Sequence, residues 1–476
     1  MADKTQKFTD EEALLHDNTI SPRDDRRDRG RAIGVACPHE LHAGWKAPSD
    51  RPDPVALLEK SNEGRLKELI PLRYGRMMQS PFTFYRGAAA LMAQDLGTLK
   101  KITAKIPVQA CGDCHLLNFG AFATPERNIV FDINDFDETL PAPWEWDLKR
   151  LAVSFVLSAR ENGLKPKFAA QAAETVVRAY RMKITELSRK SILDIWYERV
   201  EWQSVIERTS DEILQKKRAA RLKKELKRTV QDYYFPKFAE KSGGGYVLKD
   251  MPPTMYHMTG AEGKKFQGKI EKAFELYKES LQEDKRRLVN RYRLEDVSIK
   301  VVGIGSVGTL CAVALVLAPD NEPLLLQIKE ARESVLQPFV GKSSFENQGQ
   351  RVVEGQRIIQ SASDIFLGWT HFEDGKHFYV RQLRDTKVKP DPELWEGPQT
   401  VEIAEVMGNV LARAHARSGD AAIISGYLGG ATDTTFDTAV TDFALNYADQ
   451  VERDHSLLVA AIKSGRIKAK EELEED

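Results

Sequence analysis

The pattern of apolar and polar positions divides the chain into helical stretches and one β-rich stretch. Apolar residues recur at helical spacing over residues 54–99, where SPFTFYRG interrupts the pattern, over 147–238, and again after Pro398. Between residues 298 and 329 they form nearly unbroken runs, and PDNEP predicts a turn between the last two. HFYVRQL predicts a further short strand. The chain is therefore predicted to be α+β, with a mostly helical large lobe and a small β-rich lobe.

These patterns predict five segments. They are a polar N-terminal arm (1–55), a part of the large lobe that carries two acidic motifs (56–150), a helical part of the large lobe or cap (151–297), the β-rich lobe (298–395) and a helical C-terminal part of the large lobe (396–476). The arm is charge-dense, with SPRDDRRDRGR at its centre, and we expect it to be loosely draped.

Composition narrows the class of protein. The 476 residues are 42% apolar and 30% charged, and their formal net charge is −1, which favours a cytoplasmic protein without general attraction to nucleic acid or anionic membranes. No apolar run reaches 18 residues, and the first residues lack the apolar core of a signal peptide. The basic stretch QKKRAARLKKELKR contains no interleaved aromatic residues, so it is expected to be the solvated face of a helix.

Two acidic motifs, GDCHLLN at 112–118 and FDINDFDE at 131–138, predict one metal–phosphate site. Asp113 and Asn118 have the D-x-x-x-x-N spacing of the kinase catalytic loop. Asp135 follows an apolar strand, where a kinase places its metal-binding aspartate. Phosphoryl transfer needs a carboxylate that accepts the acceptor's proton and oxygen ligands that fix Mg²⁺. We therefore expect Asp113 to be the base, and Asn118 and Asp135 to be the metal ligands.

A glycine-rich segment, GIGSVG, matches G-x-G-x-x-G through Gly303, Gly305 and Gly308, with Ser306 between them. The motif fits a Rossmann pyrophosphate turn and equally the loop that covers ATP phosphates in kinases. The residues that follow, TLCAVALVLA, predict a strand and not the helix of a Rossmann turn. The kinase interpretation is therefore favoured.

Lys329 ends the next predicted strand, LLLQIKE, as the lysine does in the kinase V-A-I-K motif. A lysine buried there needs an anionic partner, and ATP phosphates together with a helix carboxylate would supply it. Glu354 is the first candidate for that carboxylate, and Glu333 is the second.

The order of these parts is unusual, since the catalytic loop precedes the glycine loop along the chain. Chain order can be permuted where termini lie close together. The sequence therefore predicts a circularly permuted, two-lobed protein-kinase-like fold that binds ATP and Mg²⁺.

The same motifs resemble two families. GDCHLLNFG, FDINDFDE and PWEWDLKRLAVS are similar to the catalytic segment of aminoglycoside and choline kinase-like phosphotransferases, and AEVMGNVLARAHARSGD resembles the helix before that segment. This resemblance implies structural support from His115 and from Asp147, which would brace the loop. Cys111 and Asp137 depart from the family pattern. RMMQSPFTFYRG followed by GDCHLLNFG also resembles an uncharacterised bacterial family of unknown function, over most of the chain beyond the arm.

Three functions follow as alternatives. The first is an ATP- and Mg²⁺-dependent phosphotransferase that acts on a small-molecule or protein hydroxyl, with AMP transfer as a variant. The second is a non-catalytic nucleotide-binding scaffold, and the third is a Rossmann-type NAD(P) oxidoreductase that uses GIGSVG. CGDCH also matches a haem-attachment pattern, but no export signal accompanies it and no second Cys/His pair stands at zinc-ligand spacing.

Overall fold

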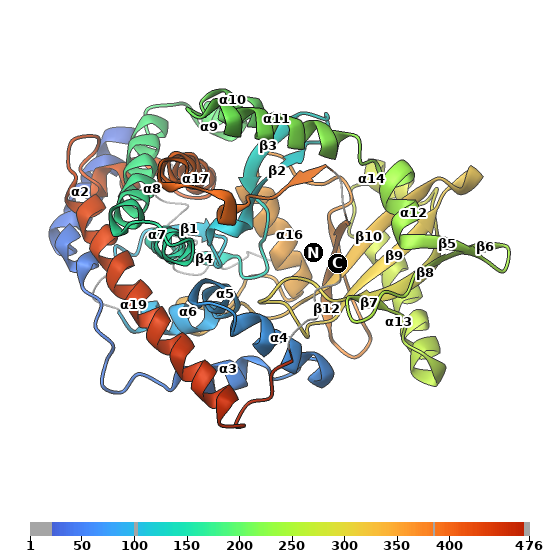
Figure 1. The fold of residues 1–476 in the computed structure, drawn as a ribbon. Helices are drawn as coiled ribbons and strands as arrows, with labels where there is room; N and C mark the ends of the chain where they lie inside the picture. Colours follow the sequence, from blue (N-terminus) through green and yellow to red (C-terminus); the bar gives the residue numbers. More distant parts are fainter. Residues whose placement is uncertain (1–20, 100–102, 384–385, 471–476) are drawn as a thin grey trace, which may run out of the picture.

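The computed structural model describes residues 21–99, 103–383 and 386–470 of the chain. It is a mixed α+β structure, in which long helices gather at one end and an antiparallel sheet forms the other (Figure 1). The acidic motifs follow two short strands, β1 (Pro107–Ala110) and β3 (Ile129–Ile133), which lie between these two parts. No described helix is long and apolar enough to cross a membrane.

The helical end is built around long, largely buried helices from both halves of the chain. Its principal members are α7 (Trp144–Glu161), α8 (Pro166–Leu187), α17 (Gly397–Ser418), α18 (Ala421–Tyr427) and α19 (Thr435–Lys463). Helix α17 packs closely on α8, since a Cβ at Gly408 would lie 2.4 Å from the Val176 carbonyl oxygen. The helices after Pro398 thus share one hydrophobic core with those after Asp147.

Shorter helices from the N-terminal region complete this core. They are α2 (Arg23–Ala36), α3 (Pro54–Ser61), α4 (Ile70–Met77), α5 (Pro81–Gly87) and α6 (Ala89–Thr98). The expected break at SPFTFYRG is confirmed, since helical structure stops at 78–80 and again at Ala88. The segment between these breaks forms α5, in which Pro81 occupies the first turn and Ser80 forms a capping box with Thr83.

The expectation of a loosely draped arm at 1–55 is wrong for its described part, while residues 1–20 lie outside the described residues. A Cβ at Gly30 on α2 would lie 2.1 Å from the backbone of Ile423 on α18, so the two helices are in direct contact. His39 and His42 are buried, and His42 Nε2 lies 2.7 Å from the Tyr427 hydroxyl. Glycine contacts and buried polar pairs therefore fix a segment whose composition is strongly charged.

The sheet has six strands, all in antiparallel pairs, in the order β11-β12-β10-β9-β8-β7. The strands are β7 (Met255–Tyr256), β8 (Arg293–Lys300), β9 (Cys311–Leu317), β10 (Pro323–Ala331), β11 (Gly368–His371) and β12 (His377–Gln382). Helix α16 (Gln348–Ile359) links β10 to β11. The β-rich prediction for this region is confirmed, since PLLLQIKEA spans β10 and HFYVRQ spans β12.

Helical segments cover both faces of the sheet. On one face, α13 (Gly260–Glu279) packs Phe274 and Tyr277 against strand residues such as Ile328. On the other face, residues from the π-helix η4 (Val230–Tyr234) and from α12 (Phe235–Phe238) pack on β9 and β10. The face that carries Lys329 is apolar where these helices pack on Val313, Leu315 and Leu325, and becomes polar toward Gln327 and Lys329.

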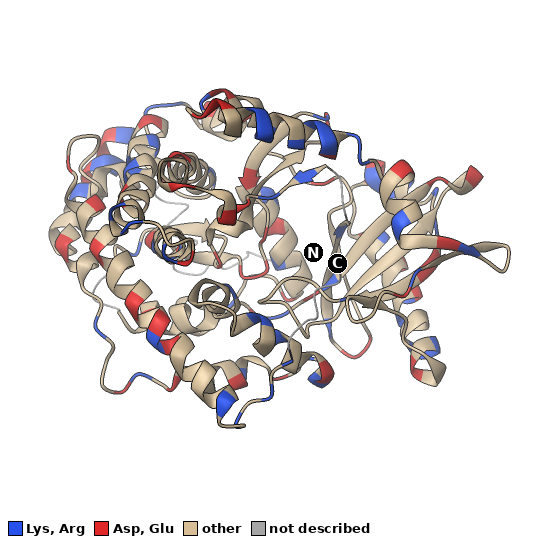
Figure 2. Ribbon diagram, viewed as in Figure 1, with Lys and Arg blue, Asp and Glu red and all other residues tan. Residues whose placement is uncertain are grey.

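The region 151–297 is not wholly helical. After α9 (Ile192–Tyr197), α10 (Trp202–Glu207) and α11 (Glu212–Leu226), strands β5 (Ala239–Ser242) and β6 (Gly245–Leu248) form a hairpin, and α14 (Glu283–Val289) leads into β8. Gly243 and Gly244 have positive φ, which suits the tight turn. Lys and Arg line α11 (Figure 2), in agreement with a charged, solvated helix face.

Candidate functional site

The candidate catalytic loop follows a short strand and is held by hydrogen bonds to α7. Strand β1 (Pro107–Ala110) pairs with β4 (Leu140–Pro143), and the loop follows at Cys111. Asp147 on α7 accepts hydrogen bonds from the backbone N–H of Cys111 at 2.7 Å and of Gly112 at 3.0 Å. His415 on α17 lies beneath, with Nε2 3.3 Å from Asp147 Oδ2, and its Nδ1 lies 2.9 Å from the Tyr180 hydroxyl. Asp147 therefore holds the loop through its backbone.

Gly112 is required by this geometry. Its φ is +83°, and a Cβ there would lie 2.4 Å from the Glu138 carbonyl oxygen. A side chain would therefore be strained by the backbone and would also collide with the second acidic motif. The two motifs are in direct backbone contact at this glycine.

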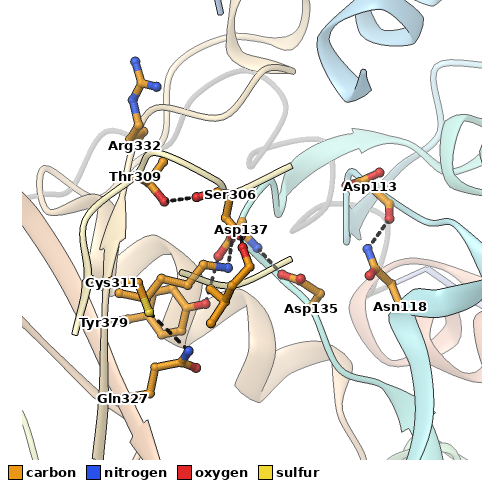
Figure 3. Close-up of polar contacts among 12 residues, drawn as sticks. Asp113, Asn118, Asp135, Asp137, Ser306, Thr309, Cys311, Gln327, Arg332 and Tyr379 are labelled. Atoms are coloured by element: carbon orange, nitrogen blue, oxygen red, sulfur yellow. Dashed lines mark hydrogen bonds and ion pairs between the residues drawn. The ribbon is translucent and has the colours of Figure 1, made fainter. Parts of the chain in front are cut away.

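Asp113 and Asn118 lie next to each other at the end of this loop (Figure 3). Asn118 Nδ2 donates to the Asp113 carbonyl oxygen at 2.7 Å. Because a carbonyl oxygen only accepts, the amide group must present its nitrogen there, which leaves the Asn118 amide oxygen free to bind a cation. Arg150 on α7 donates from Nε and Nη2 to Asp113 Oδ1, at 2.6 and 2.5 Å. Burial raises the pKa of the Asp113 carboxyl, and Arg150 partly opposes that shift.

His115 is buried within the same loop. Its Nε2 lies 4.0 Å from Asp113 Oδ2, and burial holds its pKa well below the usual range. Among the described residues its buried Nδ1 has no hydrogen-bond partner, so the supporting role expected for His115 stays a prediction.

The second acidic motif follows β3 (Ile129–Ile133), which pairs with β2 (Phe119–Ala123). Asp132 is committed to structure, because it forms a fully buried ion pair with Arg413 of α17 and also accepts from Ser361. Asp135 and Asp137 lie beyond the strand, and their side chains point toward the sheet (Figure 3). Burial raises the pKa of Asp135, but Lys329 and Arg381 together hold it below its usual value. Asp135 is therefore a carboxylate in a positive environment.

Lys329 joins the sheet to this motif. Its side chain is 4% exposed and forms an ion pair with Asp137, whose Oδ1 also accepts from the Tyr379 hydroxyl at 2.9 Å. Burial opposes the charge of Lys329, yet Asp137 more than offsets it and raises the lysine pKa well above its usual value. Lys329 and Tyr379 are register partners on β10 and β12. The structure thus brings the β-rich lobe and the second acidic motif together.

The expected partner of Lys329 is corrected here. Glu354 on α16 pairs with Arg357 at 2.9 Å, one helical turn away, and Glu333 is exposed. The carboxylate at Lys329 is Asp137 instead. The sequence correctly predicted a carboxylate partner for Lys329 but assigned it to α16. The actual partner, Asp137, is 192 positions away along the chain.

Arg351 on α16 clamps the two segments in place of Glu354. Its guanidinium donates to the carbonyl oxygens of Asp137, Thr139 and Arg332 at 2.8, 2.5 and 2.8 Å. Glu138 adds a second tie, because it accepts from the Val335 backbone N–H at 2.7 Å. Burial raises the pKa of Glu138 to about 7. Glu138 closes the FDINDFDE motif but was given no role from the sequence, and Arg351 matched no motif.

The glycine loop lies between β8 and β9 and rests on the N-terminal helices. Gly303 and Gly308 have φ of +67° and +86°, which favour glycine. Arg76 Nη1 donates to the Gly303 carbonyl oxygen at 2.5 Å, and Leu66 N–H donates to that of Gly308 at 2.7 Å. Ser306 accepts from the Thr309 hydroxyl through its carbonyl oxygen (Figure 3). The loop continues into strand β9, so the helix of a Rossmann turn does not follow it.

Two further basic residues, which no sequence motif predicted, lie near Asp135. Arg381 on β12 donates to Gln327 Oε1 at 2.9 Å and to the Asn134 carbonyl oxygen at 3.4 Å. Lys387 lies on β13 (Lys387–Val388), which pairs with β2, and burial together with Arg381 lowers its pKa to about 7. Asp135 therefore has three basic residues in its neighbourhood, Lys329, Arg381 and Lys387, of which the sequence predicted only Lys329.

The CGDCH cysteines are buried thiols. Cys111 and Cys114 lie with Asp147 in a cluster whose possible ligand atoms are within 4.8 Å of one another. Burial raises the pKa of both thiols, and the Asp147 carboxylate is already bound to two backbone donors. This arrangement is that of packed thiols beneath a loop.

The family model described as "Uncharacterized protein conserved in bacteria (DUF2252)" matches residues 65–461, most of the 476-residue chain. The chain belongs to the DUF2252 family. Searches of curated proteins and of solved structures returned no match. The matched part of this DUF2252 protein includes both acidic motifs, the glycine loop and Lys329, so the whole candidate site belongs to the family region.

Proposed function

We propose that this DUF2252 protein is an ATP- and Mg²⁺-dependent phosphotransferase with a circularly permuted protein-kinase-like fold. One observation carries the proposal, namely the ion pair between Lys329 and Asp137. It joins the sheet that holds the glycine loop to the acidic motif that a kinase uses for its metal.

The arrangement of the sheet supports the same proposal. A kinase has its glycine loop between the first two strands and its lysine on the third. Here the loop lies between β8 and β9 and Lys329 is on β10, and α16 follows after the one-turn helix α15 (Gln337–Val340). The catalytic loop comes from near residue 113 instead of from after the sheet, and this is the permutation.

The residues at the site have the ligand types that Mg²⁺ and a nucleoside triphosphate need. Mg²⁺ prefers oxygen ligands, and Asp135, Asp137 and the free amide oxygen of Asn118 are such ligands. Lys329 and the backbone of Gly303–Gly308 would bind the phosphates. The metal would neutralise charge on the transferred group.

The protein's own residues set up the proton transfer. Arg150 occupies only Oδ1 of Asp113, so Oδ2 is available to accept the proton of an acceptor hydroxyl. Asp147 fixes the backbone that carries Asp113, and the side chain of Asp113 is 21% exposed, which allows an acceptor to reach it. Binding of the phosphates at Lys329 would release Asp137 toward the metal.

The second candidate is a nucleotide-binding scaffold without catalysis. It is favoured by the fact that both Asp113 and Lys329 are already paired, with Arg150 and Asp137. The oxidoreductase alternative has less support, because a strand follows the glycine loop.

A turnover assay separates the first two candidates. Purified protein with Mg²⁺ and ATP is tested against a metabolite panel, and nucleotide binding is measured in parallel by calorimetry. We expect D113A to abolish turnover and to retain nucleotide binding, with D449A on an exposed face of α19 as the control. Binding without turnover in the wild type would favour the scaffold, and absence of ATP binding would contradict both.

A further inference from the structure

Arg86, at the end of α5, has a cationic group that the protein does not neutralise. Within the described parts of the chain, its guanidinium has no hydrogen-bond or ion-pair partner, and its buried Nε is unsatisfied. Its guanidinium carbon lies 5.9 Å from the centroid of the Phe82 ring. A partly buried, unpaired guanidinium is costly unless an anion binds it.

The neighbouring arginines show the contrast. Arg150 binds the Asp113 carboxylate, and Arg351 donates to three backbone carbonyls. Arg73 on α4 donates to Asn62 Oδ1 and to the Gly87 carbonyl oxygen. Arg86 differs from all three, because no acceptor among the described residues binds its guanidinium.

Arg86 stands between the candidate base and the glycine loop. The preceding residue, Tyr85, accepts through its carbonyl from Arg150 Nη2 at 3.0 Å, and the same guanidinium binds Asp113. The Arg86 carbonyl oxygen lies 3.3 Å from where a Cβ of Gly305 would be. Burial lowers the pKa of Arg86, and the nearby Asp113 partly offsets that effect. The backbone on either side of Arg86 thus contacts both halves of the site.

We propose that Arg86 binds an anionic oxygen group, a phosphate or a carboxylate, beside Asp113 and the glycine loop. Two sources have this chemistry, the terminal phosphate of the nucleotide and an acidic group on the acceptor. The position of Arg86 is independent of the proposed phosphotransfer, and only the distinction between these two sources rests on that function.

Calorimetry with four probes tests the proposal in the full chain. Inorganic phosphate, pyrophosphate, MgADP and MgATP are titrated into wild type, R86Q, R86K and the control R178Q, whose arginine is exposed on α8. We expect R86Q to weaken phosphate and pyrophosphate binding by about tenfold or more, because a charged hydrogen-bond donor is lost. R86K, which keeps the charge, should lose less, and R178Q should match wild type.

The nucleotides identify the source of the anion. If Arg86 contacts the terminal phosphate, R86Q weakens MgATP by about tenfold and leaves MgADP unchanged. If it contacts the acceptor, both nucleotides keep their affinity, and phosphate binding to the ADP-saturated protein is weakened. Either result supports the anion site.

Three results would overturn it. They are affinities for all four probes that stay within twofold of wild type in R86Q, an equal loss for all four in both R86Q and R86K, and a wild type that binds neither phosphate nor pyrophosphate. A wild type that binds phosphate in an Arg86-dependent way but binds no nucleotide would contradict the phosphotransferase proposal alone.

Discussion

The loop that carries Asp113 and the loop that carries Asp137 differ in what holds them. The first is fixed by the helical part, through Asp147 and Arg150 of α7. The second relies on Lys329 from the sheet for charge neutralisation. A ligand could replace Asp137 at Lys329, whereas none could replace Asp147 beneath its loop. We therefore expect the Asp113 loop to keep its conformation when a ligand binds, and the Lys329–Asp137 pair to be the contact that exchanges.

Removal of the Asp147 carboxylate, which holds the Asp113 loop, should have the largest effect on stability. D147A leaves the N–H groups of Cys111 and Gly112 buried without an acceptor, so the free energy of unfolding should fall by about 3–5 kcal/mol. Urea denaturation followed by circular dichroism measures the loss. D449A is the exposed control. A loss below 1 kcal/mol in D147A would show that the loop is held by other contacts.

Removal of Lys329 should destabilise the protein less than D147A does, but it should weaken ligand binding. K329M leaves Asp137 unpaired, but that carboxylate is 26% exposed and retains Tyr379, so we expect a loss of about 1–2 kcal/mol. MgATP binding should weaken by about tenfold or more, since a charged phosphate contact is lost. The control is K376M, whose lysine lies 3.5 Å from Glu330 at the surface. Unchanged MgATP affinity in K329M would separate the pair from the nucleotide.

The tie at Glu138 predicts a pH dependence. Its pKa is raised to about 7 from the usual 4.5, so the folded protein binds a proton that the unfolded chain releases. Its contribution to stability is therefore complete below pH 4.5 and is lost as the pH rises to about 7. The stability of wild type relative to E138Q should fall by about 1–2 kcal/mol across that window, less than the full shift implies because the carboxyl is partly exposed. A difference that is flat with pH would contradict the assignment.

Glu354 should matter least. It forms a surface pair with Arg357 and has no contact with Lys329, so E354Q should change the free energy of unfolding by less than about 0.5 kcal/mol. Thermal denaturation of E354Q and K329M under the same conditions compares their stabilities. An effect of E354Q as large as that of K329M would restore Glu354 as a partner of the lysine.

The sequence predicted the local elements of the site better than their partners. The strand pattern placed Lys329 at the end of β10, and the spacing of GDCHLLN placed Asp113 and Asn118 together. The partner of Lys329 was missed because side chains from segments far apart in the chain meet only through the packing of the lobes. Arg150 and Arg351 belong to helices whose apolar periodicity is strong, and that periodicity says nothing about which polar residue turns inward.

The N-terminal region shows the opposite failure. Charge density at 23–36 predicted a loose segment, yet Gly30 and Gly426 let α2 pack directly on α18. Small residues at a helix contact leave little trace in composition, so this packing was not predictable from the charge pattern.

The position of a bound nucleotide is the most direct test of the two-segment site. A crystal structure with Mg²⁺ and a non-hydrolysable ATP analogue should place the metal on Asp135 and Asn118, with the phosphates between Lys329 and Gly303–Gly308 and with the Lys329–Asp137 pair opened. A nucleotide bound away from either segment, or a metal that does not contact Asp135, would contradict the proposed site.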